Sequence, residues 1–393
     1  MLILSSKSSK LMKPIPYGRQ NITEQDIQAV IETLQSDYLT QGPKIDEFEK
    51  KFAEYVGCNY AVAVANGTAA LHLSAMALGV NEKSKVISTP LTFAASSNCI
   101  YYCGGSVDFV DINPKTLLLD IDLLEKKLST APKEAYQGIV AVDFAGMPVN
   151  LEKLKTIADK YRLWIIEDAC HAPGAHFTDS NGQKQFCGNG NFAALAIFSF
   201  HPVKHIACGE GGMITTNNKD LYEKLKMLRT HGITKDKNLL QENHGGWYYE
   251  MQELGYNYRL TDFQAALGIS QLSTADERLK RRREIAAVYD QAFNGTPLEV
   301  FPAQKGEAHA YHLYIIHTKK RKELYDQLRS KQIFCQVHYI PVHLQPFYQK
   351  KGFKKGMFPC TENYYDGCLS LPMYPSLTDA ELDYVINTIK SFL

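Results

Sequence analysis

The stretch FSFHPVKHIACGEGGMITT, residues Phe198–Thr216, joins an apolar run to a glycine cluster through a single lysine, Lys204. The residues that lead into it, AALAIFSF (Ala193–Phe200), have the apolar pattern of a buried strand. Lysine is among the side chains that are least often buried. Two interpretations are open: Lys204 extends from a loop into water, or its amine is held at the strand end for chemistry.

The composition indicates a soluble globular protein. The chain has 393 residues, of which 45% are hydrophobic and 22% are charged. A chain of this length rarely folds around one core, so we expect a large domain and a smaller one. The net charge of +1 leaves no basic field that would attract nucleic acid or an anionic membrane. The one dense basic run, RLKRRRE (Arg278–Glu284), is interpreted as the solvated face of a helix.

The cysteines and the apolar segments bear on the compartment. Nine cysteines are scattered singly without a CxxC pair, which is typical of small buried side chains in a reducing compartment rather than of disulfides or a zinc site. No helix carries histidines at metal-ligand spacing, so we expect no metal. The N-terminal apolar run is too short for a signal peptide, and no later segment could span a bilayer. We therefore expect a cytoplasmic protein with no membrane partner.

Apolar spacing alternates between helix-like and strand-like stretches from about residue 22 to residue 230. Near-continuous apolar strands joined by helices indicate an α/β fold, with a mostly parallel central sheet and helices on both faces. A long helical stretch from Thr261 to about Phe293 leads to a smaller C-terminal α+β domain. We predict an N-terminal arm over 1–20, a large domain over 21–268 and a small domain with its linker helix over 269–393. The strand candidates are YAVAVA, KVISTP, SVDFVDI, GIVAVDFAG, LWIIEDAC, AALAIFSF and GMITTN.

Three polar groups fall at or just after strand ends, where ligands bind in such sheets. NGT (Asn66–Thr68) opens a helix, and it is either a plain helix cap or an anion seat suited to phosphate. Asp168 is the last residue of LWIIED, at the end of an apolar strand. A structural salt bridge explains a carboxylate at this position as well as a functional role does. His171 by itself is typical of a hydrogen-bonded loop histidine. Taken one at a time, none of the three decides between the interpretations.

The combination with Lys204 is more specific than any of its members. A desolvated lysine amine has a lowered pKa and forms a Schiff base with aldehydes such as pyridoxal phosphate. That cofactor also requires an acidic residue at its pyridine nitrogen and a seat for its phosphate. Asp168 and NGT meet these two demands, so the residues predict a pyridoxal-phosphate enzyme. Asn257 and Arg259, in contrast, are typical of capping and ion pairing ahead of the next helix.

Eight motifs, spread over nearly the whole chain, are similar to those of a known family. They are IPYGRQ, LTQGPKIDEFE, NGTAALHL, TPLTFAAS, EDACHAPGA, FSFHPVKHIACGEGG, GYNYRLTDFQAALG and QVHYIPVHLQP. The sequence resembles the DegT/StrS-type sugar-nucleotide aminotransferases, which have the type I fold of pyridoxal-phosphate enzymes. FHPVK with GEGG, WYYEMQELGYNYRLTDFQAALG and QVHYIPV are most similar to the transaminases of UDP-4-amino-4,6-dideoxy-N-acetyl-β-L-altrosamine in pseudaminic acid biosynthesis. Related sugar dehydratases have histidine in place of the lysine, so the resemblance favours transamination.

The resemblance implies a role for each matched residue. Lys204 would hold the cofactor covalently and act in catalysis with Asp168, which would pair with the pyridinium nitrogen. His171 would lie beside the phenolic oxygen, and Phe93 would stack on the ring. The residues matched to the phosphate site are Gly67, Thr68, Ser199 and, reaching the neighbouring subunit's phosphate, Asn257. The positions matched to the sugar-nucleotide pocket are Tyr17, Asp37, Tyr38, Leu39, Thr40, Val337, His338, Tyr339 and Ile340.

The implied activity is amino transfer from L-glutamate to C4 of a UDP-linked 4-keto-6-deoxy-N-acetylhexosamine, in a homodimer with shared active sites. Relatives that act on bacillosamine or perosamine precursors share the cofactor motifs, so the sugar stays open. A cofactor-binding sensor of sugar nucleotides is a second class. FCGNGNF (Phe186–Phe192) offers a GxG but precedes a strand instead of following one, which disfavours a nicotinamide dehydrogenase. His205 departs from the family, whose members commonly have proline after the lysine.

Overall fold

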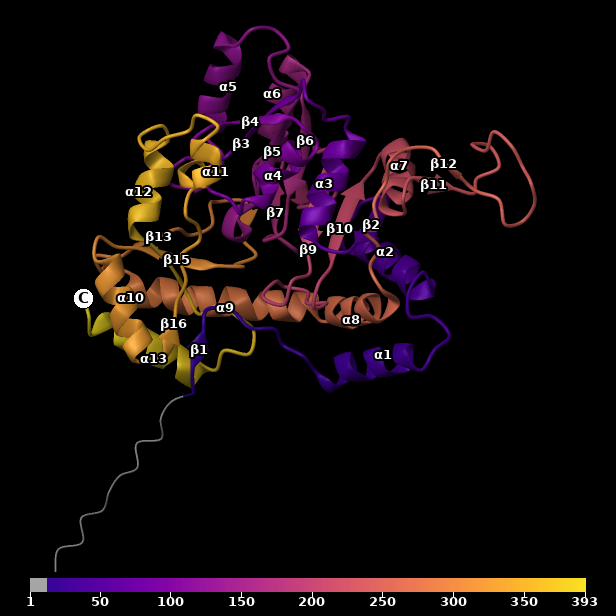
Figure 1. The fold of residues 1–393 in the computed structure, drawn as a ribbon. Helices are drawn as coiled ribbons and strands as arrows, with labels where there is room; N and C mark the ends of the chain where they lie inside the picture. The colour runs from indigo at the N-terminus through magenta and orange to yellow at the C-terminus, as the bar shows by residue number, and fades with distance from the viewer. Residues whose placement is uncertain (1–12) are drawn as a thin grey trace, which may run out of the picture.

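The computed structural model describes residues 13–393, and residues 1–12 of the expected N-terminal arm lie outside the described part. A seven-stranded sheet in the order β2-β10-β9-β6-β5-β3-β4 forms the centre of the protein (Figure 1). All neighbouring pairs are parallel except those of β10, which is antiparallel to β2 and β9. The predicted mostly parallel sheet is confirmed. Its strands are β2 (Tyr60–Val64), β3 (Lys85–Ser88), β4 (Ser106–Phe109), β5 (Gly138–Val142), β6 (Trp164–Asp168), β9 (Leu195–Ser199) and β10 (Gly212–Thr216).

Helices cover both faces of the sheet because its strands carry apolar side chains on both. In β2, Val62 and Val64 pack with α3, α4 and α7, whereas Ala61 and Ala63 pack with α2 and α8. Successive side chains of a strand point to opposite faces, so a sheet covered twice has near-continuous apolar strands. The helices between residues 24 and 229 are α1 (Glu24–Leu34), α2 (Pro43–Val56), α3 (Gly67–Ala77), α4 (Ala95–Tyr102), α5 (Ile121–Thr130), α6 (Leu151–Tyr161) and α7 (Lys219–Arg229).

The C-terminal part has a small antiparallel sheet of its own, in the order β13-β15-β17. A further strand, β1 (Ile15–Pro16), pairs with β16 (Ile333–Phe334), so the N-terminal segment lies against the C-terminal part. The boundaries at residues 20 and 268 stay a prediction. The remaining elements are β7 (His176–Thr178), β8 (Lys184–Phe186), β11 (Ile233–Thr234), β12 (Glu250–Met251), α8 (Asp262–Ser273), α9 (Ala275–Phe293), β13 (Glu299–Val300), β14 (Glu307–Ala308), β15 (Tyr314–His317), α10 (Arg321–Ser330), α11 (Pro346–Gln349), α12 (Pro359–Gly367), β17 (Cys368–Leu371) and α13 (Asp379–Lys390).

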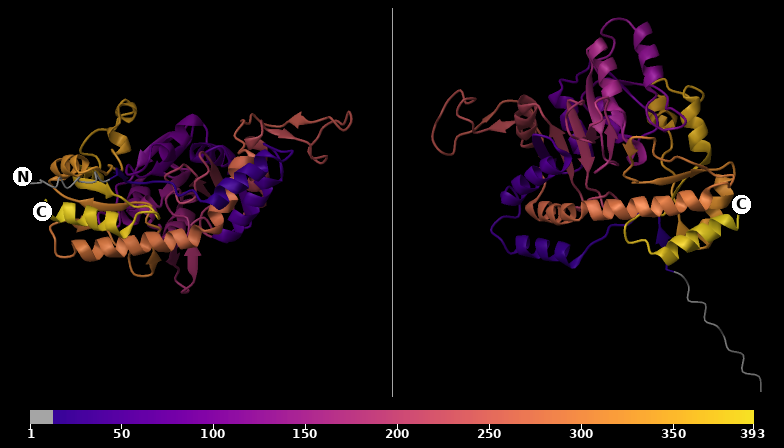
Figure 2. Two further views of the ribbon diagram at one scale, coloured as in Figure 1. Left: turned by 90° about the horizontal axis from the view of Figure 1, so that it is seen from below. Right: turned by 180° about the vertical axis from the view of Figure 1, so that it is seen from behind.

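The predicted long helix is in fact two helices, α8 and α9, which lie nearly in line along one side of the molecule (Figures 1 and 2). The basic run on α9 is not a solvated face: Arg278 and Arg282 are only 7% and 2% exposed. Arg282 donates from Nη1 to the backbone oxygens of Tyr311 and Met373. A charged group can be buried when hydrogen bonds of this kind satisfy it, and charge counting along the sequence does not reveal them.

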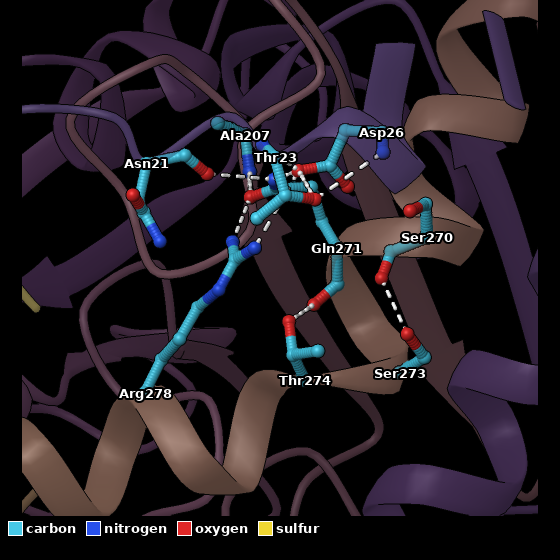
Figure 3. Close-up of polar contacts among 9 residues, drawn as sticks. All are labelled: Asn21, Thr23, Asp26, Ala207, Ser270, Gln271, Ser273, Thr274 and Arg278. Atoms are coloured by element: carbon cyan, nitrogen blue, oxygen red, sulfur yellow. Dashed lines mark hydrogen bonds and ion pairs between the residues drawn. The ribbon is translucent and has the colours of Figure 1, made fainter. Parts of the chain in front are cut away.

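Gln271 of α8 joins four parts of the chain (Figure 3). Its amide nitrogen donates to the backbone oxygen of Asn21 at 3.0 Å and to the carboxylate of Asp26 at 2.7 Å. Its amide oxygen accepts from the N–H of Ala207 at 3.4 Å and from the guanidinium of Arg278. These four bonds use the whole hydrogen-bonding capacity of the buried amide. The N-terminal segment is thereby tied to the loop that follows the lysine.

Two apolar surfaces stay exposed. On α1, Ile27, Ile31 and Leu34 are 44%, 40% and 55% exposed. The β11–β12 hairpin and its connecting loop project from the body on the right of Figure 1, and the same projection is visible in both views of Figure 2. Trp247 and Leu254 lie in or beside this hairpin and are 74% and 73% exposed. None of the helices in residues 13–393 is both long and apolar enough to cross a membrane.

Candidate active site

A cavity of about 450 Å³ lies at the carboxyl edge of the central sheet. The segments that follow β2, β3, β5, β6 and β9 all reach it, as expected for ligand sites in parallel sheets. The cavity is lined by Tyr17, Asn66, Gly67, Thr68, Leu71, Thr92, Phe93, Ala95, Val142, Phe144, Asp168, Cys170, His171, Ser199, His201, Val203, Lys204, Glu210, His338 and Tyr339.

Lys204 lies half-buried in the wall of this cavity. Burial lowers the pKa of its amine, and the neighbouring Cys170 and Asp168 oppose that effect. Among residues 13–393, no carboxylate lies within ion-pair distance of the amine. A less strongly protonated amine with free space around it is suited to attack a carbonyl group. Of the two interpretations of the opening stretch, the structure therefore supports chemistry.

Asp168 is 6% exposed and is held in a fixed orientation. Its Oδ2 accepts from the hydroxyl of Ser96 at 2.6 Å, and its Oδ1 accepts from the N–H of Cys170 at 3.2 Å. Both donors are neutral groups, and together they fix the orientation of the carboxylate. The structural salt bridge considered above is absent from the described residues, since no cation forms an ion pair with Asp168 there.

The N-terminus of α3 faces the cavity through Gly67 and Thr68. Asn66 caps the helix, with its side chain accepting from the N–H of Ala69 at 2.8 Å. The first N–H groups of a helix have no partner within the helix and favour an anion. A Cβ atom on Gly67 would lie 3.0 Å from the Cβ of Ser199, so glycine is what leaves room here. NGT is thus both a helix cap and an open anion seat.

Close approach of the backbone also explains why glycine is needed in the cluster after the lysine. A Cβ atom on Gly212 would lie 2.5 Å from the backbone oxygen of Asn66. The first residue of β10 therefore has to be glycine for the strand to approach the start of α3 this closely. The cluster in the opening stretch thereby brings the lysine loop, residues 200–211, beside the anion seat.

His171 and two aromatic rings complete the wall. The Nδ1 of His171 accepts from the N–H of Ala145 at 3.2 Å, and its Nε2 lies 3.3 Å from the hydroxyl of Tyr339. Burial, and then the charge of Lys204, hold the pKa of His171 well below its usual range. Phe93 is 60% exposed, with its ring 6.0 Å from that of Tyr339. A ring exposed to the cavity in this way is available to stack on a planar ligand.

The structure brings some of the expected sugar-pocket residues to the cavity and not others. Tyr17, His338 and Tyr339 line it, and the rings of Tyr17 and His338 lie 5.0 Å apart. The sugar-pocket residues that do not line the cavity of this chain are Asp37, Tyr38, Leu39, Thr40, Val337 and Ile340. Asn257, which was expected to reach the neighbouring subunit's phosphate, does not line it either. Thr40 pairs with Thr261 and the N–H of Asp262 donates to Leu39, so residues 39–40 lie beside the start of α8.

Several residues of the site were not anticipated from the sequence. Ser96 and Cys170 hold Asp168, and Phe144 enters from the turn after β5. Cys170 stands between two residues already singled out, so its position in EDACH was an available signal. Ser96 is the last residue of the quoted TPLTFAAS, but nothing in that motif indicates which side chain its hydroxyl contacts.

A second polar group is buried outside the cavity, around Asp143, Glu167 and Cys187, whose ligand-type atoms lie within 4.8 Å of one another. Asp143 accepts from the N–H of Val149 at 2.8 Å, and Glu167 accepts from that of Gly188 at 3.0 Å. Within residues 13–393, the second oxygen of each carboxyl group has no donor. The simplest account is one proton shared between them. Such atoms also bind metals, so the expectation of no metal stays a prediction.

This pair predicts a decrease in stability as the pH rises from mildly acidic to neutral. Burial raises the pKa of Glu167 to about 7, and burial followed by the charge of Glu167 raises that of Asp143 well above its ordinary value. A carboxyl whose pKa is higher in the folded than in the unfolded state stabilises the fold at low pH, and this contribution is lost as pH rises through the folded value. Between about pH 4.5, the ordinary value of this carboxyl, and about pH 7, the titration of Glu167 should therefore lower the unfolding free energy by up to about 1.4 kcal/mol per pH unit, and its contribution should level off above that range.

The matched variant is Glu167→Gln, whose amide can donate to Asp143 but does not ionise. Urea unfolding of the cofactor-free protein and the variant between pH 5 and 9 measures the effect. The difference between the two curves cancels the titration of the buried histidines that both proteins share. Parallel curves over this range would show that no proton is shared.

The cavity fits pyridoxal phosphate by the chemistry of its donors. It offers an amine of lowered pKa, a carboxylate held by two hydrogen bonds, and a helix N-terminus where only glycine leaves room. These are the three demands of that cofactor: an amine for its aldehyde, an acid for its ring nitrogen and a seat for its phosphate.

Comparison with known proteins leads to the same cofactor. A model of the DegT/DnrJ/EryC1/StrS aminotransferase family matches residues 20–390. The UDP-4-amino-4,6-dideoxy-N-acetyl-β-L-altrosamine transaminase of Campylobacter jejuni is 38% identical over 96% of this chain and 97% of its own. Helicobacter pylori PseC, an aminotransferase of pseudaminic acid biosynthesis, has a TM-score of 0.86 at 29% identity, over 96% of this chain and 99% of its own.

The fold is also that of Spr1654 from Streptococcus pneumoniae, solved in pyridoxal-phosphate and pyridoxamine-phosphate forms. Its TM-scores are 0.87 and 0.88, each at 30% identity and over 96% of this chain and 98% of that one. The type I fold of pyridoxal-phosphate enzymes is thereby confirmed. The chain belongs to the DegT/DnrJ/EryC1/StrS aminotransferase family, and it is a pyridoxal-phosphate-dependent sugar aminotransferase.

Proposed function

We propose that the protein transfers the amino group of L-glutamate to C4 of UDP-2-acetamido-2,6-dideoxy-β-L-arabino-hex-4-ulose, in pseudaminic acid biosynthesis. The observation that carries the aminotransferase chemistry is the placement of Lys204, Asp168 and the N-terminus of α3 around one cavity. The choice of this sugar rests on the similarity over nearly the whole chain to the Campylobacter transaminase. A UDP-linked 4-keto sugar of the bacillosamine or perosamine type is the alternative.

In this proposal each residue of the cavity has its own role in the transfer of the amino group. Pyridoxal phosphate, when bound, supplies an aldehyde that takes up the amino group and a protonated ring that draws electrons from the substrate carbon. Lys204 would hold the cofactor through its aldehyde carbon, and its Nζ, when free, would remove the proton from the Cα of glutamate. The same nitrogen later delivers a proton to C4 of the sugar.

Asp168 keeps the ring nitrogen protonated, and the hydroxyl of Ser96 orients the carboxylate for this task. Gly67, Thr68 and Ser199 bind the phosphate, and Phe93 stacks on the ring. His171 donates toward the phenolic oxygen. Glutamate and the sugar use the site in turn, between the cofactor and the side chains of Tyr17, His338 and Tyr339, which line the cavity.

The site is completed by a second copy of the chain. Asn257 and residues 37–40 do not line the cavity of their own chain, yet they are exposed. Leu39 and Thr40 contact Asp262 and Thr261 at the start of α8, a few residues after Asn257 in the chain. The hairpin with Trp247 projects from the body, and large apolar surfaces of this kind favour protein contacts. In a symmetric dimer each copy would reach the cavity of the other.

Mixing two inactive chains tests this sharing. Asn257→Ala chains keep Lys204, and Lys204→Ala chains keep Asn257, so a mixed dimer contains one intact site if Asn257 acts across the interface. Random re-association at equal amounts should restore about one quarter of the wild-type activity. Demonstrated mixed dimers without any recovered activity would place Asn257 in its own chain's site or outside the site.

The proposed function is tested by incubating the purified protein with glutamate and a panel of UDP-4-keto sugars. The visible absorbance of the lysine-bound cofactor should shift with glutamate alone, which a sensor without turnover would not produce. The aminosugar is then identified by mass spectrometry and NMR. A product only from a sugar of the bacillosamine or perosamine type would refute the pseudaminic substrate while leaving the aminotransferase class intact.

The cysteines support a location for this reaction. All nine are free, and free thiols are the rule in reducing compartments. We place the protein in the cytoplasm on this ground.

A further inference from the structure

His171 is held as a single tautomer. Its Nδ1 accepts a hydrogen bond from the N–H of Ala145 at 3.2 Å, and a ring nitrogen that accepts cannot carry a hydrogen. The ring is 5% exposed and neutral, because burial and the charge of Lys204 disfavour its protonated form. Its hydrogen therefore resides on Nε2, the nitrogen 3.3 Å from the hydroxyl of Tyr339. His171 is a hydrogen-bond donor on the cavity side of its ring.

The N–H that fixes this tautomer comes from a strained turn at residues 144–146. Ala145 has a φ of 60°, in the left-handed region that costs a non-glycine residue about 1 kcal/mol. Gly146 has a φ of 99°, and a Cβ atom there would lie 2.7 Å from the backbone oxygen of His171. Strain of this kind persists only where the surroundings hold it, and it gathers at functional sites.

The turn is held from the C-terminal part of the chain. The N–H of Ala310 donates to the backbone oxygen of Gly146 at 2.8 Å, and the N–H of Leu313 donates to that of Ala145 at 3.2 Å. The segment that contains Ala310 is therefore the support against which the strained turn rests.

His205, directly after Lys204, forms a hydrogen bond to the same segment. Its Nε2 lies 2.9 Å from the backbone oxygen of Ala310, and since a carbonyl only accepts, the ring donates. The ring is 8% exposed, and its Nδ1 has no partner within residues 13–393. His312 packs between the two histidines, with its ring 4.2 Å from His171 and 5.8 Å from His205. A continuous path thus leads from Lys204 through His205, the supporting segment and the strained turn to His171.

We infer that His205 is a positioning residue that fixes the separation between the amine of Lys204 and the Nε2–H of His171. The aldehyde carbon and the phenolic oxygen of pyridoxal phosphate stand on neighbouring carbons of one ring. An amine that serves the first and a donor that serves the second must keep a constant spacing, and a misplacement of about 1 Å can cost 100-fold in rate. The inference rests on the roles proposed for Lys204 and His171.

His205→Leu removes the hydrogen bond to Ala310, and His205→Gln restores it, because the amide nitrogen of glutamine is the same number of bonds from Cβ as Nε2. The first readout is ¹⁵N NMR of histidine-labelled, cofactor-free protein, with the His171 signals assigned through His171→Gln. In wild type and in His205→Gln, Nδ1 should be unprotonated and Nε2 protonated. In His205→Leu, the signals should move toward the average of two tautomers.

The second readout is the single-turnover rate with glutamate, which His205→Leu should lower about 10- to 100-fold and His205→Gln should largely preserve. Unchanged His171 signals and rate in His205→Leu would overturn the inference, and so would a loss in His205→Gln as large as in His205→Leu. If His205→Leu does not fold, as judged by circular dichroism, the shorter His205→Asn takes its place. A wild-type protein that does not react with glutamate would instead contradict the proposed function.

Discussion

Lys204→Ala abolishes both the visible absorbance of the lysine-bound cofactor and the transfer of amino groups, while the fold remains intact. The reason is that one nitrogen has two tasks in the proposed mechanism: it binds the aldehyde, and it moves the proton at the reacting carbon. Alanine removes both, and a proton-transfer group alone contributes about 10²- to 10⁴-fold. We expect the rate with glutamate to fall by at least about 10⁴-fold, measured in single turnovers by absorbance.

The matched control is Lys219→Ala. Lys219 is an exposed lysine at the start of α7, outside the cavity, so its loss should leave absorbance and rate unchanged. Circular dichroism and thermal unfolding should be the same for all three proteins, because alanine at either position leaves no buried charge unpaired. Added alkylamines should recover part of the lost rate in Lys204→Ala by replacing the missing base. Amino transfer at the wild-type rate in that variant would remove Lys204 from the mechanism.

The sequence was informative where one physical demand determines several residues. Strand-like apolar runs predicted the covered parallel sheet, because burial on both faces leaves few other choices. Lys204, Asp168 and NGT were found together because one cofactor needs an amine, an acid and an anion seat at the ends of strands. Their meeting in one cavity followed from the sheet topology, which places those ends along one edge.

What could not be predicted depends on contacts between distant segments. Arg282 looked solvated because its acceptors are backbone oxygens about 30 and 90 residues further along the chain. Ser96 gave no sign of its bond to Asp168, because the two are 72 residues apart in the sequence and meet only in the folded protein. The significance of His205 likewise required Ala310 to be in place. Polar contacts of this kind have no periodicity along the sequence, so no sequence pattern predicts them.

Asp168→Asn keeps the cofactor bound to Lys204 and loses most of the activity. Asparagine has the same shape, and its side-chain oxygen can still accept from the hydroxyl of Ser96 or the N–H of Cys170, both of which hold the aspartate now. What the variant lacks is the negative charge that, in the proposed mechanism, keeps the ring nitrogen protonated. Loss of one preorganised electrostatic partner of this type costs about 10²- to 10³-fold in rate. Single turnovers with glutamate should show this fall while the visible absorbance persists.

Ser96→Ala separates the charge from its orientation. This variant keeps the carboxylate and removes only the 2.6 Å hydrogen bond that holds it, so we expect a loss of about tenfold, corresponding to about 1.4 kcal/mol. The decisive observation is the order of the two variants under the same conditions. If Ser96→Ala is as slow as Asp168→Asn, the site depends on the geometry of its carboxyl group rather than on its charge. If Asp168→Asn turns over at a near-normal rate, Asp168 has no part in the mechanism, and the ring nitrogen must find its proton elsewhere.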